Sequence, residues 1–278
     1  MNPKISVVVL THNSYTEKSG SVEFVIDSYL KQKTSPFEII VVDNGSDNNN
    51  TKQLEAFCST KPRVKIIKAH TTIGGARNVG VKNASGTHII FNDDDTILLA
   101  DNILDRISTY CTKGSYGYGA KRLWSPDINW VKSHVSDITT ALESKNWDCL
   151  REFSLNPSQD IRYKNEISVK MLTRSFVGNF GFISVKDFIG VGGFPEYPGY
   201  GCEDDAFAFL CYLKFGKPVI LSDEISVLHI SHPINSSNLQ QLENNKTLLQ
   251  KLFEQYSCKH FHISRVLFPS DKPIIDCK

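Results

Sequence analysis

The chain has 278 residues, 40% of them hydrophobic and 22% charged, which is enough to bury a sizeable core without disulfide or metal cross-links. Its 31 Lys and Arg nearly balance its 30 Asp and Glu, leaving a formal charge of +1. This composition excludes a disordered or fibrous protein, and without a strongly basic field no nucleic-acid partner is expected.

Seven cysteines include no Cys-x-x-Cys pair, and no apolar signal segment follows the first residues, Met-Asn-Pro-Lys. Reduced thiols in a cytoplasmic protein are the simplest interpretation. Apolar runs such as 5–10 are far shorter than the ~18–20 residues of a membrane-spanning helix. We therefore expect a cytoplasmic protein and leave open a peripheral attachment at the inner membrane face.

The first third of the chain alternates short apolar runs with amphipathic segments. The expected buried strands are 5–10, 37–42, 64–68 and 87–91. The expected helices between and after them are 22–31, 51–58, 75–83 and one capped by Asp101 that runs to Tyr110. This alternation predicts an α/β fold with a mixed, mostly parallel central sheet flanked by helices.

The remaining chain is less regular. Residues 121–170 allow no assignment, but an apolar run at 176–185 leads through a glycine-rich loop at 190–201 into a helix at 203–215. Leucines at helical spacing over 238–255 favour a packed terminal helix over a membrane anchor. We divide the chain into a nucleotide-binding half (1–120), a second half of the same domain (121–235) and a helical tail (236–278).

Acidic residues follow two of the expected strands where each strand ends. Asp43-Asn-Gly-Ser-Asp47 comes after 37–42, and Asp93-Asp-Asp95 comes after 87–91. Ligands of open α/β sheets bind beyond the carboxyl ends of the strands. The first cluster also suits an ordinary turn, whereas three adjacent carboxylates repel one another unless a cation or hydrogen-bond donors compensate.

The triplet predicts a divalent-metal site. In an extended segment Asp93 and Asp95 would point to the same side, and Mg²⁺ or Mn²⁺ typically shares such carboxylates with substrate phosphates. Between the two clusters lies Gly74-Gly-Ala-Arg-Asn-Val-Gly80, whose small residues let a ligand approach and whose Arg77 is either a phosphate or base contact or a surface helix residue. Neither a dinucleotide-binding glycine fingerprint nor a P-loop is present.

Five segments, taken together and in order, carry a family resemblance. They are Thr11-His-Asn13, Asp43-Asn-Gly-Ser-Asp47, Gly75-Ala-Arg-Asn78, Asp93-Asp-Asp95 and Gly199-Tyr-Gly-Cys-Glu-Asp-Asp205. Over about residues 4–232 the chain resembles the family 2 glycosyltransferases of the GT-A fold. Its second half, from Gly192-Gly-Phe-Pro-Glu196 onward, is similar to the carboxyl half of galactosyl- and N-acetylgalactosaminyltransferases.

The resemblance implies an inverting transfer of a hexose or N-acetylhexosamine from a UDP-sugar to a hydroxyl of a glycan, glycolipid or peptide, assisted by Mn²⁺ or Mg²⁺. The donor-binding residues that it implies are Thr11, Asn13, Asp43, Arg77, Asp93 and Asp94. The metal ligands that it implies are Asp95 with a late histidine, either His232 or His229. The acceptor side comprises Asp205, Tyr200 and Gly201. The general base is Asp204, beside Glu203, which is assigned either to catalysis or to holding acceptor hydroxyls.

Other interpretations stay open. The cluster at 203–205 either provides the base or only caps its helix, and we expect the helix N-terminus to keep Asp204 charged. Asn92, Pro195 and Tyr200 depart from the family pattern and leave the sugar undetermined. A sugar-nucleotide nucleotidyltransferase would normally carry a glycine-rich basic loop after its first strand, which this chain lacks. A carbohydrate-binding module would have no use for a metal.

Overall fold

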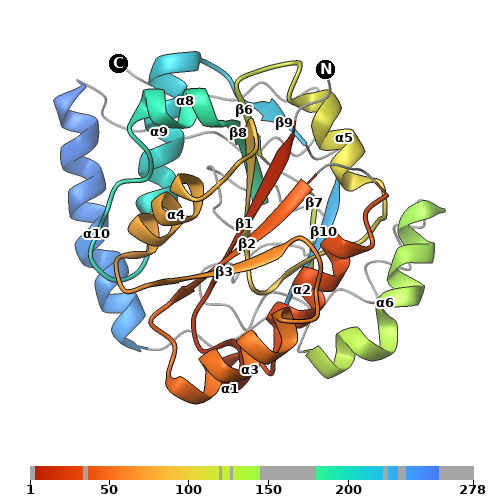
Figure 1. Cartoon of the computed structure of the whole chain (residues 1–278). Coiled ribbons are helices and arrows are strands. Elements are labelled where there is room, and N and C mark those ends of the chain that lie inside the picture. The colour runs from red at the N-terminus through yellow and green to blue at the C-terminus, as the bar shows by residue number, and fades with distance from the viewer. Residues whose placement is uncertain are drawn as a thin grey trace.

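The computed structural model describes residues 4–33, 37–118, 121–125, 128–144, 180–221, 225–230 and 236–256. It is an α/β fold with a central sheet between two layers of helices (Figure 1). The described strands are β1 (Ile5–Thr11), β2 (Phe37–Asn44), β3 (Val64–Ala69), β4 (His88–Asp93), β5 (Thr96–Leu98), β6 (Tyr116–Tyr118), β7 (Lys121–Ser125), β8 (Phe180–Ser184), β9 (Val219–Ile220) and β10 (Ser226–Ile230). The described helices are α1 (Ser14–Glu17), α2 (Ser21–Leu30), α3 (Asn48–Cys58), α4 (Ile73–Lys82), α5 (Ile103–Tyr110), α6 (Ile128–Glu143), α8 (Val185–Val191), α9 (Glu203–Phe215) and α10 (Ser236–Gln255).

The central sheet is mixed and mostly parallel, as predicted. Within the described ranges its order is β3-β2-β1-β4-β8-β6-β9, and a smaller sheet has the order β5-β10-β7. β1 pairs in parallel with β2 and β4, whereas β8 runs antiparallel to β4. The four expected strands are therefore confirmed as four adjacent parallel strands, β3-β2-β1-β4, and strands from both halves of the chain build the sheet.

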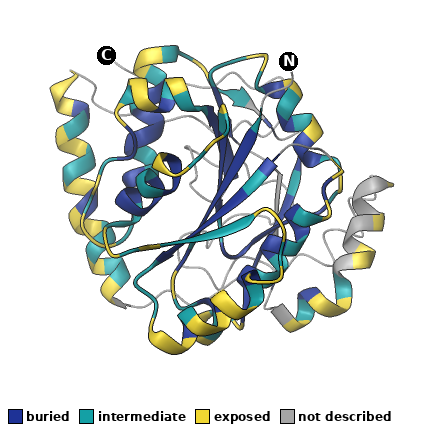
Figure 2. Ribbon diagram, in the orientation of Figure 1, coloured by how far each residue is buried: buried dark blue, intermediate teal, exposed yellow. Residues whose placement is uncertain are grey.

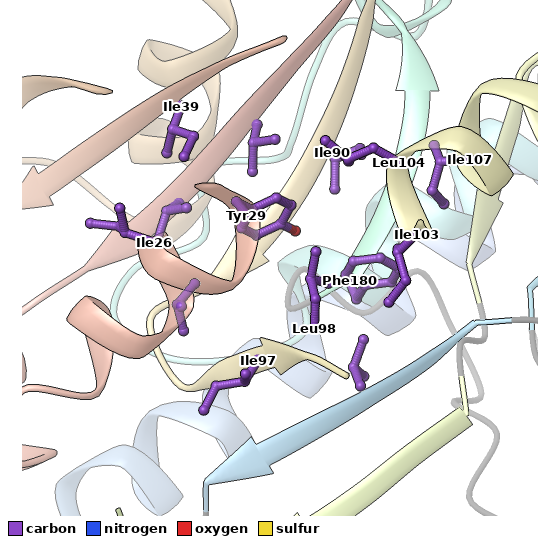
Figure 3. Packing of buried hydrophobic residues seen from close by; sticks show 14 of the residues in the cluster. Ile26, Tyr29, Ile39, Ile90, Ile97, Leu98, Ile103, Leu104, Ile107 and Phe180 are labelled. Atoms are coloured by element: carbon purple, nitrogen blue, oxygen red, sulfur yellow. The ribbon is translucent and has the colours of Figure 1, made fainter. Parts of the chain in front are cut away.

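Both faces of this sheet are covered, which explains why its strands are continuous apolar runs. Side chains alternate along β1: Val7 and Val9 pack with α2 and α5 on one face, and Val8 packs with α4, α8 and α9 on the other. Figure 2 shows the strands buried along most of their length. Figure 3 shows Ile26 and Tyr29 of α2 packed in the first of these two clusters.

Local caps explain several helix starts. The Asp47 carboxylate accepts hydrogen bonds from two backbone N–H groups at the start of α3, and the Thr72 hydroxyl accepts one at the start of α4. The expected cap at Asp101 is wrong. α5 begins at Ile103, so its N-cap is Asn102 and not Asp101. The Asp101 carboxylate pairs with Lys33 at 2.5 Å on the exposed surface.

The tail helix α10 is confirmed as a packed helix. It lies against α9 at the side of the molecule (Figure 1), where Phe253 stacks edge-on to Phe209 with ring centroids 4.8 Å apart. Among the described helices, none is both long and apolar enough to cross a bilayer. The stretch 121–170, for which the sequence allowed no assignment, contains β7 and α6, and residues 145–179 lie outside the described part of the chain.

Candidate active site

The predicted acidic residues meet at one edge of the sheet because they follow neighbouring parallel strands. In the register of the sheet Thr11 lies opposite Asp43, and Leu10 lies opposite Asp93. The ends of β1, β2 and β4 therefore place the residues predicted for donor binding side by side.

The loops after β1 and β2 are tied to each other. The buried Asp43 carboxylate accepts hydrogen bonds from the Ser46 backbone N–H (3.2 Å) and the Thr51 hydroxyl (2.7 Å). The Asn13 backbone N–H donates to Ser46 Oγ (2.8 Å), and Asn13 Oδ1 accepts from the Asp47 backbone N–H (2.9 Å). These bonds hold Asn13 and Asp43 next to each other at the floor of the site.

The side chains of Asp93, Asp94 and Asp95, at the end of β4, do not alternate in direction as they would along an extended strand. β4 ends at Asp93, and Asp94 and Asp95 lie in the following turn, so the condition for Asp93 and Asp95 to share one side through strand alternation is not met. Asp94 is 1% exposed and accepts from the Thr11 hydroxyl at 2.7 Å. Asp95 is also buried, whereas the Asp93 side chain is 28% exposed and is the most accessible of the three.

Lys18 lies among these carboxylates and was not predicted. Its Nζ is 2.5 Å from Asp94 Oδ1 and 3.2 Å from Asp95 Oδ2. Burial alone would lower the pKa of Lys18, but the negative charges of Asp94 and Asp95 outweigh burial and raise it, so the amine stays charged. Lys18 lies immediately before a tight turn between α1 and α2, in which Ser19 has φ 51° and Gly20 has φ 75°. The Ser-Gly pair was the only local signal for that turn.

Arg77 joins the donor side of the site to the start of α9. Its guanidinium is buried and donates to Asp93 Oδ1 at 3.1 Å and to Glu203 Oε1 at 2.7 Å. Burial opposes the charge on Arg77, but these two carboxylates outweigh burial and raise the pKa of Arg77. The alternative of a surface helix residue is wrong for Arg77. Glu203 is 6% exposed and bound to Arg77, which leaves this carboxylate poorly placed to hold an acceptor hydroxyl.

Asp204 and Asp205 follow Glu203 in the first turn of α9, and both are half-buried. Partial removal from water raises the pKa of the Asp204 carboxyl well above its usual range, and the charges of Asp205 and Glu203 act in the same direction. The expectation that the helix N-terminus keeps Asp204 charged is therefore wrong in direction. Burial first, and then the neighbouring charges of Asp205 and Glu203, oppose the charged form that a helix N-terminus favours, so the Asp204 carboxyl holds its proton more strongly than a free aspartate does.

A second link crosses from α4 to the glycine-rich loop before α9. Asn78 Nδ2 donates to the Phe194 carbonyl (3.0 Å), and Asn78 Oδ1 accepts from the Phe194 backbone N–H (2.8 Å). Asn78 belongs to the motif at 75–78, but the sequence predicted no role for it. Tyr200 and Gly201, predicted to line the acceptor side, lie in the same loop.

The donor atoms present fit a small divalent cation. Asp93 and Asp95 offer carboxylate oxygens, and His229 Nε2 lies 3.6 Å from Asp95 Oδ1. Within the part of the chain that the structure describes, no three His, Cys, Asp or Glu side chains form a complete metal site, and His232 lies outside that part. Mg²⁺ and Mn²⁺ need only one or two protein carboxylates when water and phosphates supply the other ligands. Binding at Asp95 would require Lys18 to give up its contact.

A mostly parallel sheet with acidic residues at its strand ends, and a second acidic cluster linked to them through Arg77, is the arrangement expected of a GT-A fold. The model of the glycosyl transferase family 2 matches residues 6–177, more than half of the chain. The chain therefore belongs to this family, as its sequence motifs indicated.

Comparisons with known proteins agree. The uncharacterized glycosyltransferase YfnE of Bacillus subtilis is 24% identical over 272 residues, covering 87% of this chain and 68% of YfnE. A glucosyltransferase of Escherichia coli, WfgD, is 31% identical over 118 residues, covering 41% of this chain and 44% of WfgD; its full name is UDP-Glc:alpha-D-GlcNAc-diphosphoundecaprenol beta-1,3-glucosyltransferase.

Similarity to solved structures supports the fold. The crystal structure of GalNAc-T7 with UDP, GalNAc and Mn²⁺ superposes with a TM-score of 0.60 at 16% identity, over 90% of this chain and 48% of GalNAc-T7. Some relatives are much longer than the shared segment: the match spans 16% of a glycosyltransferase of Rickettsia conorii and 27% of EpsJ of Bacillus subtilis.

Proposed function

We propose that the chain is an inverting glycosyltransferase that moves a hexose or N-acetylhexosamine from a UDP-sugar to a hydroxyl of a glycan or glycolipid. The observation that carries this proposal is the bridge of Arg77 between Asp93 and Glu203, at 3.1 and 2.7 Å. Through this bridge a single side chain, Arg77, connects Asp93 on the donor side with the acidic turn that contains Asp204. Glycosyl transfer needs both groups around one anomeric carbon.

On the donor side, Thr11, Asn13 and Asp43 form the proposed floor for the nucleotide. Asp43 would accept a hydrogen bond from uracil, and the loop contacts of Asn13 keep that floor rigid. Asp95, with His229 or His232, would hold Mn²⁺ or Mg²⁺, and Asp93 would contact the ribose or the surroundings of the ion. When bound, such an ion neutralises the negative charge of the departing diphosphate.

On the acceptor side, Asp204 is the proposed general base. Its carboxylate takes the proton of the acceptor hydroxyl while the hydroxyl oxygen bonds to the anomeric carbon and the bond from that carbon to the diphosphate oxygen breaks. A base whose pKa is raised toward the working pH holds a proton more strongly in the transition state. Single displacement of an α-linked UDP-sugar gives a β-linked product. Glu203 acts through Arg77 as a positioning residue, and Asp205, Tyr200 and Gly201 line the acceptor side.

The names of two relatives support this choice of substrates. WfgD is named for a UDP-glucose donor and a lipid-linked acceptor, and GalNAc-T7 was solved with UDP, GalNAc and Mn²⁺. We infer that a lipid-linked glycan is among the acceptors to test first, and contact with the membrane that carries such a lipid stays a prediction.

A hydrolysis screen tests the proposal without a known acceptor. UDP- and GDP-sugars are incubated with the protein and Mn²⁺, and release of the nucleoside diphosphate is followed by chromatography. We expect hydrolysis of a UDP-hexose or UDP-N-acetylhexosamine, with the β anomer of the sugar seen first by NMR. Asp204→Asn should lower the rate of hydrolysis by about 10²–10⁴-fold, whereas Asp105→Asn, the same change on the exposed face of α5, should leave the rate unchanged. Release from GDP-sugars alone, or none at all, would contradict the proposal.

A further inference from the structure

The helix α10 does more than cover one side of the molecule: one of its residues holds the loop that leads into α9. Asn245 is 1% exposed, although it is polar and lies in the middle of a surface helix. Its side-chain Nδ2 donates to the carbonyl oxygens of Pro198 (2.9 Å), Tyr200 (3.1 Å) and Gly201 (3.0 Å). An amide NH₂ has two hydrogens, so three acceptors at this distance include at least one shared hydrogen bond.

The loop backbone is shaped to lie directly on α10. Gly199 has φ 68° and Gly201 has φ 90°, a conformation that L side chains rarely adopt. A Cβ atom at Gly199 would lie 2.4 Å from the Gln241 side chain, and one at Gly201 would lie 2.6 Å from Leu242 Cδ1. Gln241 and Leu242 precede Asn245 by four and three residues, about one helical turn, so each neighbours Asn245 on the surface of α10.

The held segment ends immediately before the acidic turn. Cys202, with φ 68°, is the N-cap of α9, and Glu203 and Asp204 follow it. The other end of the loop is fixed by Asn78 through Phe194, and Glu203 is fixed by Arg77. Without Asn245, the stretch between Phe194 and Glu203 would lose its three contacts with this amide.

We propose that Asn245 is a positioning residue that sets the place of Asp204 by fixing the backbone of 198–201. The proposal rests on the proposed function of Asp204 as the general base. Asn245 touches neither substrate nor reacting atoms, and its effect passes through three main-chain carbonyls. Any residue at 245 that cannot donate to these carbonyls would let the loop, and the start of α9 behind it, leave the reactive position.

The test replaces the donor without changing its shape. Asn245→Asp exchanges the amide for a carboxylate, which cannot donate and repels the three carbonyls, and Asn245→Ala removes the donor without adding charge in case the first variant does not fold. Asn244→Asp is the matched control, because Asn244 is the neighbouring residue of α10 and is exposed. Hydrogen exchange of the peptide 194–202, UDP affinity by calorimetry, and kcat and KM for hydrolysis of the UDP-sugar found in the screen are measured for each.

We expect faster exchange in 194–202, an unchanged UDP affinity and a kcat lower by about 10²-fold in the Asn245 variants, since a shift of about 1 Å in a catalytic group has that effect. Asn244→Asp should match the wild type in all three. Wild-type kcat in the Asn245 variants, unchanged loop exchange, or a loss of UDP affinity equal to the loss of kcat would each overturn the inference. If the wild-type protein hydrolyses no sugar nucleotide, the proposed function fails and takes this inference with it. If the wild-type protein hydrolyses a UDP-sugar and the Asn245 variants behave as it does, the proposed function stands and only this inference fails.

Discussion

The contact of Lys18 with the aspartate turn offers the sharpest test of a metal at this site. Lys18→Met keeps the length of the side chain but removes its charge. Asp94 and Asp95 have side chains only 1% and 4% exposed, so the change leaves buried carboxylates without their cation. Breaking one side of such a buried pair typically costs about 3–5 kcal/mol. For a chain of this size, at roughly 2 °C per kcal/mol, the melting temperature in EDTA should fall by about 6–10 °C.

A divalent cation should reverse this loss. In the wild-type protein Mn²⁺ has to displace the Lys18 ammonium from Asp95, and a hydrogen bond to a charged group is worth about 1.5–3 kcal/mol. Because 1.4 kcal/mol corresponds to tenfold in affinity, we expect Lys18→Met to bind Mn²⁺ about tenfold more tightly or better, and to gain more melting temperature from Mn²⁺ than the wild type does.

Scanning fluorimetry in EDTA and in MnCl₂, together with calorimetric titration of Mn²⁺ with and without UDP, measures both effects. The matched control is Lys33→Met. Lys33 pairs with Asp101 at the same 2.5 Å, but the two side chains are 73% and 50% exposed, so water screens this pair and its loss should leave the melting temperature nearly unchanged. Equal destabilisation by the two substitutions, or unchanged or weaker Mn²⁺ binding in Lys18→Met, would refute this reasoning.

Other predictions concern catalysis, pH and stability. Asp204→Asn should lower kcat by about 10²–10⁴-fold, or about 3–5 kcal/mol in the barrier, and leave UDP affinity unchanged by calorimetry; a retained kcat would exclude Asp204 as the base. Since the base has to be deprotonated and the pKa of Asp204 is raised, activity should be lost as pH falls through a value well above the usual range of an aspartate, and a kcat profile flat from neutral pH to pH 4 would contradict this. Arg77→Leu should lower stability by about 3–5 kcal/mol in urea unfolding, because Glu203 would be left buried without its cation; a loss below about 1 kcal/mol would speak against the bridge. Burial raises the pKa of Glu38, but hydrogen bonds from Ser6 and Ser85 outweigh burial and hold it at about 2, so the stability that this carboxylate contributes should be present above pH 4.5 and lost as pH falls from there toward 2. Glu38→Gln should remove that part of the pH dependence, and an identical acid transition in both proteins would contradict the assignment.

Local sequence patterns were enough for the four parallel strands of the first third of the chain, for the helices between them and for the ends of those strands. β-branched runs such as 5–10 and 37–42 indicate buried strands, because a strand covered on both faces has to be apolar along its whole length. Asp43 and Asp93 were predicted at strand ends, where open α/β sheets bind their ligands, and the register of β1 with β2 and β4 places both at the same edge of the sheet. Motif order alone indicated the family, and the match over 6–177 confirms it.

The pairing of charges inside the site was decided by the tertiary structure. Arg77 and Glu203 are 126 residues apart in the chain, and Lys18 and Asp94 are 76 apart. The spacing of apolar residues predicts only on which face of its own helix or strand a side chain lies. It does not predict which distant charged residue will contact that face. For the same reason the leucine pattern of 238–255 predicted a packed helix but not the role of Asn245. Asn245 contacts a loop that lies 44 to 47 residues away in the chain, and only the tertiary structure brings the two together.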